Sequence, residues 1–333
     1  MEKTRIAING FGRIGRLVLK ASFARGLKVC AINDLADPKT LAHLLKYDST
    51  HGRFPGEVYS EGKTLVVNGR AIDVLSEPQP AKLPWGALGI DTALESTGRF
   101  NSRDKAAAHL EAGAGRVVVS APARDADAVI VLGVNDSDLS PGHRVVSNAS
   151  CTTNCLAPMV KVLHERFGVT CGTMNTIHSY TNDQHVLDQP HKDLRRARGA
   201  GINMIPTTTG AAAAVGEVIP ELMGKLNGLS IRVPTPDGSL TDFTAVVKRP
   251  TSASEVNEAF RAAAAGPLKE YLEYSEEPLV LSDIIGNPAS CIFDAQSTTV
   301  VGGTLVKMLG WYDNEWGYAN RCADLMLRLA VIQ

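Results

Sequence analysis

The sequence predicts an α/β protein of two domains: a doubly wound parallel sheet, followed by an α+β domain with a mostly antiparallel sheet. Two patterns indicate this architecture. Strand-like and helix-like runs alternate from residue 4 to about residue 150, which is typical of parallel sheets, and β-rich runs with longer loops follow. The length of 333 residues also favours two domains over a single core.

The first element is a strand over 4–8 that leads into the glycine motif INGFGRIG at 8–15. Gly10, Gly12 and Gly15 fit GxGxxG, which provides a tight turn, close approach to a pyrophosphate and close packing of the helix that follows. Alone, the motif is also compatible with an ordinary glycine turn.

A second strand, over 27–32, ends just before Asp34. This residue lies about 20 positions beyond the glycines, where a dinucleotide site places a carboxylate on the ribose 2′-hydroxyl. Glycines and aspartate together predict a Rossmann-type site rather than a chance turn and a solvated acid. Asp34 favours NAD, because its charge would repel the 2′-phosphate of NADP.

The alternation continues through the first domain. Helices are expected over 40–45 and 102–112, and strands over 64–67, within 92–98, over 117–119 and over 129–133. Ligands of such sheets bind beyond the carboxyl ends of strands, so Thr97, Gly98 and Ser120 are candidate cofactor contacts. Ordinary loop roles are equally compatible with these three residues.

Cys151 precedes an apolar stretch, and we expect it at or near the start of a helix. Backbone N–H groups and the helix dipole stabilise a thiolate there, which makes a cysteine nucleophilic at neutral pH. The alternative is a buried structural cysteine, but hydrogen-bonding neighbours are costly to bury beside an inert thiol. These neighbours are Ser150, Thr152, Thr153 and Asn154.

His178 is the best placed of the eight histidines to act as the base for Cys151. It ends an expected strand and begins a polar loop of the kind that carries function. A thiol and an imidazole within reach form a thiolate–imidazolium pair. A structural histidine is equally compatible with the sequence alone.

The second half has β-rich runs at 170–177, 229–233, 242–248 and 304–312. Ser252 and Glu255 form a capping box for a helix that ends at 265. We therefore expect an NAD-binding domain over 1–150 and a catalytic domain over 151–314. A last helix, within 315–333, is expected to pack back on the first domain.

Composition argues against several kinds of partner. The 34 Lys and Arg residues balance 35 Asp and Glu, so no nucleic-acid or membrane surface is indicated. The sequence shows no signal segment or transmembrane run, which predicts a cytosolic protein. The six cysteines are scattered without a CxxC pair, which predicts reduced thiols and no metal site.

Several motifs resemble the phosphorylating glyceraldehyde-3-phosphate dehydrogenases, and together with INGFGRIG they extend the resemblance over the whole chain. They are ASCTTN (149–154), HSYTNDQ (178–184), HKDLRR (191–196), PTTTGAA (206–212), RVPTP (232–236) and WYDNEWGY (311–318). The resemblance implies a homotetramer that oxidises D-glyceraldehyde 3-phosphate to 1,3-bisphosphoglycerate in glycolysis or gluconeogenesis, with NAD and inorganic phosphate.

The resemblance also implies residue roles. Cys151 matches the residue that forms a thiohemiacetal and then a thioester, His178 the proton acceptor, and Asn314 the residue that holds the nicotinamide carboxamide. The further matches are Thr181, Arg196 and Arg232 for the substrate's C3 phosphate; Ser150, Thr152, Thr209 and Gly210 for the attacking phosphate; and Gly10, Arg13, Ile14, Asp34 and Ser120 for the dinucleotide.

Two residues depart from the family pattern. Ala213 stands where many members carry lysine, and Gln189 stands where leucine is common, in a loop that in this family reaches the neighbouring subunit's adenosine site. A neutral amide there would tolerate NADP better than leucine. Two alternatives remain: the related erythrose-4-phosphate dehydrogenase, against which Thr181, Thr209 and Gly210 argue, and a non-catalytic binding protein.

Overall fold

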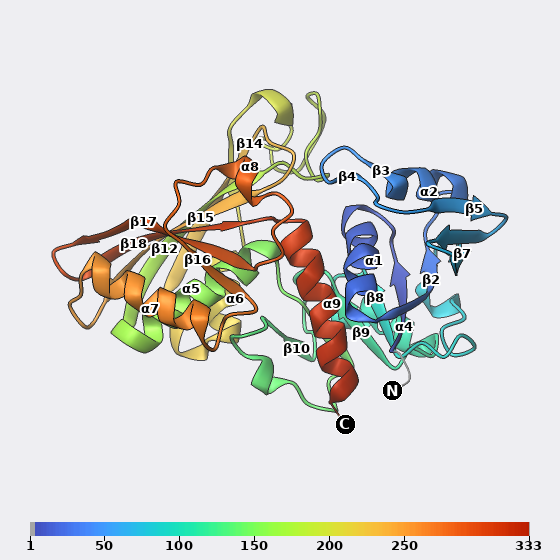
Figure 1. Ribbon diagram of the computed structural model, residues 1–333, viewed down its shortest axis with the longest axis horizontal. Coiled ribbons are helices and arrows are strands. Elements are labelled where there is room, and N and C mark those ends of the chain that lie inside the picture. Colours follow the sequence, from blue (N-terminus) through green and yellow to red (C-terminus); the bar gives the residue numbers. More distant parts are fainter. Residues whose placement is uncertain (1–3, 333) are drawn as a thin grey trace. The chain divides into compact units, whose positions relative to one another are not determined.

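The structure is a computed structural model that describes residues 4–332. The domain predicted over 1–150 starts with residues 1–3 and the helix predicted within 315–333 ends with residue 333, and these four residues lie outside the described part. The chain divides into two compact units (Figure 1). The first comprises the described residues of Met1–Ile130, Ser137–Ala149 and Ala319–Gln333. The second comprises Val131–Asp136 and Ser150–Tyr318.

The first unit contains a nine-stranded sheet in the order β10-β11-β9-β8-β1-β2-β7-β6-β5. Neighbours from β10 to β7 are parallel, and β6 and β5 are antiparallel additions at one edge. This confirms the predicted doubly wound sheet. Its strands are β1 (Arg5–Asn9), β2 (Lys28–Asn33), β5 (Val58–Glu61), β6 (Thr64–Val67), β7 (Arg70–Leu75), β8 (Thr92–Glu95), β9 (Arg116–Val119), β10 (Ala128–Val129) and β11 (Val145–Ser147).

Helices and a small hairpin complete this part of the chain. They are α1 (Arg13–Arg25), α2 (Pro38–Lys46), α3 (Arg103–Ala106), α4 (Ala108–Glu111), the 3-10 turns η1 (Pro80–Lys82) and η2 (Asp136–Asp138), and the paired strands β3 (Tyr47–Asp48) and β4 (Gly52–Arg53). The central strands β1, β8 and β9 are almost wholly buried, as expected for parallel strands covered on both faces.

Two predicted elements of this unit differ from the structure. The helix expected over 102–112 is broken at Ala107, where the N–H of Leu110 bonds the carbonyl only three residues back. The strand expected over 129–133 keeps only its first residue. Val131 instead donates its N–H to the Asn135 side chain, and Gly133 turns the chain with a φ of +83°.

The second unit contains a seven-stranded sheet in the order β13-β14-β12-β15-β18-β17-β16. Four neighbouring pairs are antiparallel and two are parallel, which confirms a mostly antiparallel sheet. Its strands are β12 (Val169–Ser179), β13 (Ile205–Thr208), β14 (Leu226–Val233), β15 (Ser239–Val247), β16 (Leu272–Ser275), β17 (Cys291–Val301) and β18 (Leu305–Tyr312).

Helices α5 (Cys151–Phe167), α6 (Ala211–Val218) and α7 (Ala253–Ala265) pack on this sheet, and Figure 1 shows them on one face. The predicted capping box of Ser252 and Glu255 opens α7. The remaining elements are η3 (Ala200–Ile202), η4 (Pro220–Leu222), α8 (Leu281–Ile284) and α9 (Trp316–Val331).

From Ala319 onward, α9 belongs to the first unit. Asp324 forms an ion pair with Arg25 of α1 there, and Arg116 of β9 donates to the carbonyl of Leu329. None of the helices within residues 4–332 combines the length and the hydropathy that a membrane span requires.

Candidate active site

Cys151 is the first residue of α5, as predicted. Ser150 caps this helix by accepting the N–H of Thr153 at 3.0 Å. Ala149, just before the cap, has a φ of +53°, a conformation that costs energy in a non-glycine residue and often occurs at functional sites. The strained turn and the cap together fix the thiol at the positive end of the helix dipole.

His178 lies on the neighbouring strand β12, with its Nε2 3.5 Å from the Sγ of Cys151. The carbonyl of Ser179 accepts from Nδ1–H of His178 at 2.7 Å and from Nη1 of Arg232 at 3.1 Å. Nη1 of Arg232 also lies 2.9 Å from Nδ1, but it has the same carbonyl oxygen as its acceptor; with the Nδ1 proton directed to that carbonyl, the lone pair of Nε2 faces the thiol. The imidazole is therefore oriented as a base toward Cys151.

The pKa values differ from the expected thiolate–imidazolium pair. Burial raises the pKa of Cys151 to about 11, although Arg232 and hydrogen bonds from Thr152 act in the opposite direction. Burial and the positive charge of Arg232 lower the pKa of His178 to about 3. Without a ligand, a neutral thiol and a neutral imidazole are favoured.

A buried tyrosine supports this pair. The hydroxyl of Tyr312 lies 2.9 Å from Oγ1 of Thr152 and 2.8 Å from Oγ1 of Thr176, joining α5 to β12. Its ring also meets the ring of His178 edge-on. Burial raises the pKa of Tyr312 above its ordinary value, so it stays a neutral hydrogen-bonding group.

Asn314 is fixed through its side-chain oxygen, which accepts from Oγ of Ser179 at 2.9 Å and Oγ of Ser239 at 2.7 Å. The orientation is thereby set, and the amide NH₂ has no partner among the described residues. A fixed NH₂ donor suits the carbonyl of a carboxamide ligand.

The residues predicted to bind phosphate form two groups, one for the C3 phosphate of the substrate (Arg232, Thr181 and Arg196) and one for the attacking phosphate, which includes Thr209 and Gly210. Arg232 pairs in register with His178, and Thr181 follows the end of β12. Arg196 lies in the same unit but is held by Asp183 and by Oγ1 of Thr207. Thr209 and Gly210 lie at the N-terminus of α6, which packs against α5.

In the first unit, a pocket of about 260 Å³ lies beyond the carboxyl ends of β1, β2 and β8. It brings together four predicted cofactor residues: Gly10, Gly12, Asp34 and Thr97. Gly98 follows with a φ of +73°. Arg13, Ile14 and Gly15 open α1 and Ser120 follows β9; these four are not among the described lining residues.

The glycines and Asp34 fit a dinucleotide. A Cβ on Gly15 would lie 2.1 Å from the carbonyl oxygen of Gly10, whereas the space above Gly12 is open toward a ligand. Asp34 accepts the N–H of Phe11 at 2.7 Å and of Ala36 at 3.0 Å, which ties the glycine loop to β2. Its carboxylate retains lone pairs for a ribose hydroxyl.

No pattern along the chain indicated the buried polar network beneath this pocket. Glu95 accepts hydrogen bonds from Asn9 Nδ2 at 2.6 Å and from Thr97 N–H at 2.8 Å, and both residues line the pocket. The indole N–H of Trp85 can only donate, so Nδ1 of His109 accepts its hydrogen bond and the ring proton of His109 lies on Nε2. This Nε2 faces the carboxylate of Glu95 at 3.0 Å. A buried carboxylate thus orders two pocket-lining residues.

Comparison with known proteins identifies the two parts of the chain. Residues 4–103 match the domain family described as glyceraldehyde 3-phosphate dehydrogenase, NAD binding domain, and residues 150–314 match the C-terminal domain of the same enzyme. The chain belongs to the glyceraldehyde-3-phosphate dehydrogenase family. This confirms the family inferred from the motifs, and NAD is the cofactor of the matched domain.

Curated relatives extend this match over nearly the whole length. The glyceraldehyde-3-phosphate dehydrogenase of Geobacillus stearothermophilus is 56% identical, covering 98% of each chain. Glyceraldehyde-3-phosphate dehydrogenase 2 of Streptomyces avermitilis is 55% identical, covering 96% of this chain and 97% of the relative. Glyceraldehyde-3-phosphate dehydrogenase 1 of Bacillus subtilis is also 55% identical, covering 98% of each.

Arg13, at the start of α1, leads to a prediction about acid stability. Its Nη1 lies 2.9 Å from Oδ1 of Asp48. Although burial raises the pKa of Asp48, hydrogen bonds from the His51 N–H, Arg13 and the Thr50 N–H lower it to about 2. The ionised carboxylate therefore stabilises the fold above pH 4, and this stabilisation is lost as the pH falls toward 2.

We expect Asp48→Asn to be less stable than the wild type at neutral pH, with the difference shrinking as the pH falls from 4 to 2. Urea unfolding at a series of pH values measures this difference. A constant difference over the whole range would show that Asp48 does not act through its charge.

Proposed function

We propose that this member of the family catalyses the phosphorylating oxidation of D-glyceraldehyde 3-phosphate to 1,3-bisphosphoglycerate. The observation that carries the proposal is the 3.5 Å approach of Cys151 Sγ to His178 Nε2 at the start of a helix. A thiol and an oriented base at this position suit covalent catalysis on an aldehyde.

In the first step, Sγ of Cys151 bonds to the aldehyde carbon, and the thiol proton passes through Nε2 of His178 to the carbonyl oxygen, which gives a thiohemiacetal and leaves His178 neutral. NAD, held by the glycine loop, Asp34 and Asn314, would supply the acceptor for the hydride of that carbon. His178 takes the hydroxyl proton as the C–O double bond re-forms, leaving a thioester on Cys151. An oxygen of inorganic phosphate then attacks the thioester carbon, which releases the acyl phosphate and returns the thiol.

The proposed reaction requires two anion-binding sites, one for each phosphate group. We assign the C3 phosphate of the substrate to Thr181 and Arg232, with Arg196 nearby. Arg232 is charged and adjoins His178, and a guanidinium fork suits phosphate oxygens. The attacking phosphate is assigned to Ser150, Thr152, Thr209 and Gly210, since the N-termini of α5 and α6 present backbone N–H groups there.

We assign the dinucleotide to Gly10, Gly12, Arg13, Ile14, Gly15, Asp34, Thr97, Gly98 and Ser120, and the nicotinamide carboxamide to the NH₂ group of Asn314. Accordingly, residues 1–150 with the helix in 315–333 form the NAD-binding domain, and residues 151–314 form the catalytic domain. The six free cysteines suit a reducing compartment, which supports a cytoplasmic location.

The first test concerns the nucleophile. Cys151→Ser should abolish NAD reduction, because a serine hydroxyl is not ionised at neutral pH and is a far weaker nucleophile. Cys155→Ala is the matched control one turn further along α5, and it should retain turnover. Rates on both glyceraldehyde 3-phosphate and erythrose 4-phosphate identify the preferred aldehyde, and full activity of Cys151→Ser would rule out the mechanism.

The second test concerns the base. His178→Asn should lower the rate of hydride transfer by roughly 10²–10⁴-fold, the usual contribution of general acid–base catalysis. NAD binding, measured by fluorescence titration, should stay unchanged, because it does not require proton transfer. If stopped-flow traces of the variant matched the wild type, another group would have to act on Cys151.

The third test concerns the choice of cofactor. A 2′-phosphate beside Asp34 is repelled by about 4 kcal/mol at about 4 Å and an effective dielectric of about 20. A neutral hydrogen bond from Gln189 contributes only about 0.5–1.5 kcal/mol. NAD should therefore be clearly preferred. The double variant Asp34→Gly with Leu35→Ser should raise kcat/KM for NADP by a much larger factor than the factor by which Gln189→Leu lowers it. Equal kcat/KM values for NAD and NADP in the wild type would contradict this prediction.

The fourth test concerns assembly. We propose a homotetramer, supported by five exposed apolar side chains in the segment 186–204, a surface of the kind that a second copy covers. They are Val186, Leu187, Leu194, Ile202 and Met204, each more than 70% exposed. Light scattering after gel filtration should give a tetramer mass for the wild type and Tyr59→Glu, and a smaller mass for Leu194→Glu. A monomeric wild type would contradict the proposal.

A further inference from the structure

A second pocket in the first unit lies at the opposite end of the parallel strands from the cofactor pocket. It has a volume of about 690 Å³, within the usual range for small-molecule sites. Arg5 begins β1, Thr92 begins β8 and Arg116 begins β9, while Arg144 directly precedes β11. The last turn of α9 contributes Ala330. The function proposed above makes no use of this pocket.

The pocket has an excess of positive charge. Its lining contains three arginines and one carboxylate, Asp91, which accepts the backbone N–H of Arg5 at 2.7 Å. Within the described part of the chain, none of the three guanidinium groups forms an ion pair with a carboxylate. Because arginine stays protonated in proteins, this charge is permanent.

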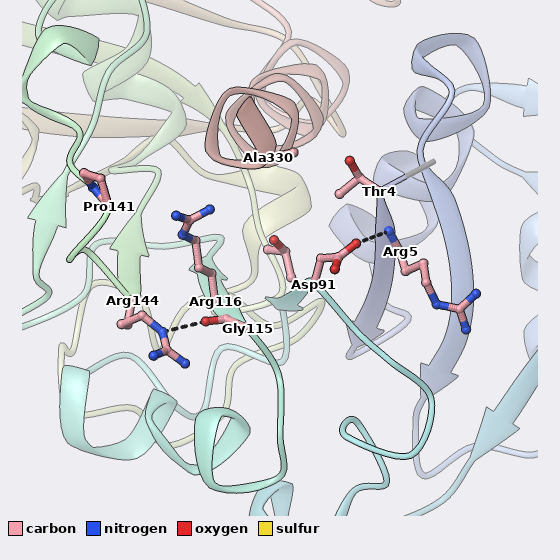
Figure 2. A pocket seen from close by; sticks show the side chains of 9 residues that line it. Thr4, Arg5, Asp91, Gly115, Arg116, Pro141, Arg144 and Ala330 are labelled. Carbon is pink, nitrogen blue, oxygen red and sulfur yellow. Dashed lines mark hydrogen bonds between the residues drawn. The ribbon is translucent and has the colours of Figure 1, made fainter. Parts of the chain in front are cut away.

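All three arginines are held in place by backbone carbonyls. Arg5 donates to the carbonyls of Leu88 and Gly89, and its guanidinium points away from Arg116 and Arg144 (Figure 2). Arg144 donates from Nε to the carbonyl of Gly115 at 2.6 Å, and Arg116 donates to the carbonyls of Leu329 and Ile332 at the end of α9. Among the described residues, no partner engages the two Nη groups of Arg144 or Nε of Arg116. The guanidinium groups are therefore ordered before a ligand binds, which lowers the entropy cost of binding.

Arg116 and Arg144 are neighbours across the sheet. The N–H of Val117 bonds the carbonyl of Arg144 at 2.7 Å, and β9 and β11 run parallel from that point. Figure 2 shows both side chains along the same pocket, with the guanidinium of Arg116 directed toward α9 and that of Arg144 beside Gly115, and with Thr4 and Asp91 across from them. Like charges on adjacent strands repel, and an anion between them would offset this repulsion.

We propose that this pocket, which we call the arginine pocket, binds a small ligand that carries an oligophosphate group. Phosphate oxygens match the fork geometry of a guanidinium group, which Arg144 offers with its two Nη groups, and Arg116 adds its Nε–H and a second positive charge beside it; this combination suits two linked phosphates better than one. The ligand is either a free oligophosphate or a nucleotide whose base and sugar occupy the remaining volume.

Isothermal titration calorimetry of the full chain, saturated with NAD, tests the proposal with inorganic tripolyphosphate as the probe. We expect saturable binding to the wild type at physiological salt. Arg144→Gln should weaken it by at least roughly tenfold, since it removes a charge-assisted donor pair. Arg166→Gln removes one exposed charge from the last turn of α5, in the other unit, and is the matched control that should bind as the wild type does.

Arg116→Gln is a second variant. Its unfolding midpoint is measured as well, because Arg116 also caps the C-terminal end of α9 and its loss could lower stability. Rates of NAD reduction should be unchanged in Arg144→Gln, which separates the arginine pocket from the catalytic anion sites. Tighter Arg144-dependent binding of ATP than of tripolyphosphate would identify a nucleotide, and equal or weaker binding a free oligophosphate. No saturable binding to the wild type, or equal losses in Arg144→Gln and Arg166→Gln, would overturn the proposal.

Discussion

The chemistry proposed for the second unit depends on one constraint: Cys151 is the first residue of α5 and faces an imidazole on β12. The capping bond of Ser150 and the positive φ of Ala149 fix where the helix begins. A start one residue later or earlier would rotate the side chain by about 100° around the helix axis and remove it from His178. The local strain at Ala149 is the cost of this placement.

A polar layer around the pair keeps both partners oriented. Tyr312 joins Thr152 and Thr176, and the hydroxyls of Ser179 and Ser239 hold Asn314. These groups are buried and hydrogen-bonded to one another, so they stabilise one arrangement of α5, β12 and β18 without adding a charge, and they leave the NH₂ of Asn314 for a ligand. Arg232 is the permanent charge beside this layer, and it favours a neutral imidazole until an anion arrives.

In the first unit, the two ends of the parallel sheet carry opposite kinds of polar group. At the carboxyl ends, Asp34 and the buried Glu95 fix a glycine loop that leaves room for a dinucleotide. At the amino ends, arginines bind backbone carbonyls and line a second pocket. In a parallel sheet, the loops that follow the strands lie at one end and the loops that precede the strands lie at the other, which keeps the two kinds of polar group apart.

The sequence by itself determined the doubly wound and mostly antiparallel sheets, the glycine loop with Asp34, the helix start at Cys151 and the family. These features depend on local patterns: strand and helix periods, capping residues and motifs of fixed spacing. It missed β17, and it overextended the strand expected over 129–133, because apolar runs alone do not show where tertiary hydrogen bonds divert a chain.

Only the tertiary structure decided the contacts between residues far apart in sequence. It joined Glu95 to His109 and Trp85, Tyr312 to Thr152, and Arg116 to Arg144, none of which has a local signal. It also decided the charge state of the Cys151 and His178 pair, since a pKa depends on burial and on neighbouring charges such as Arg232. The spacing of residues along the chain contains no information about these distant contacts or about the charge state of this pair.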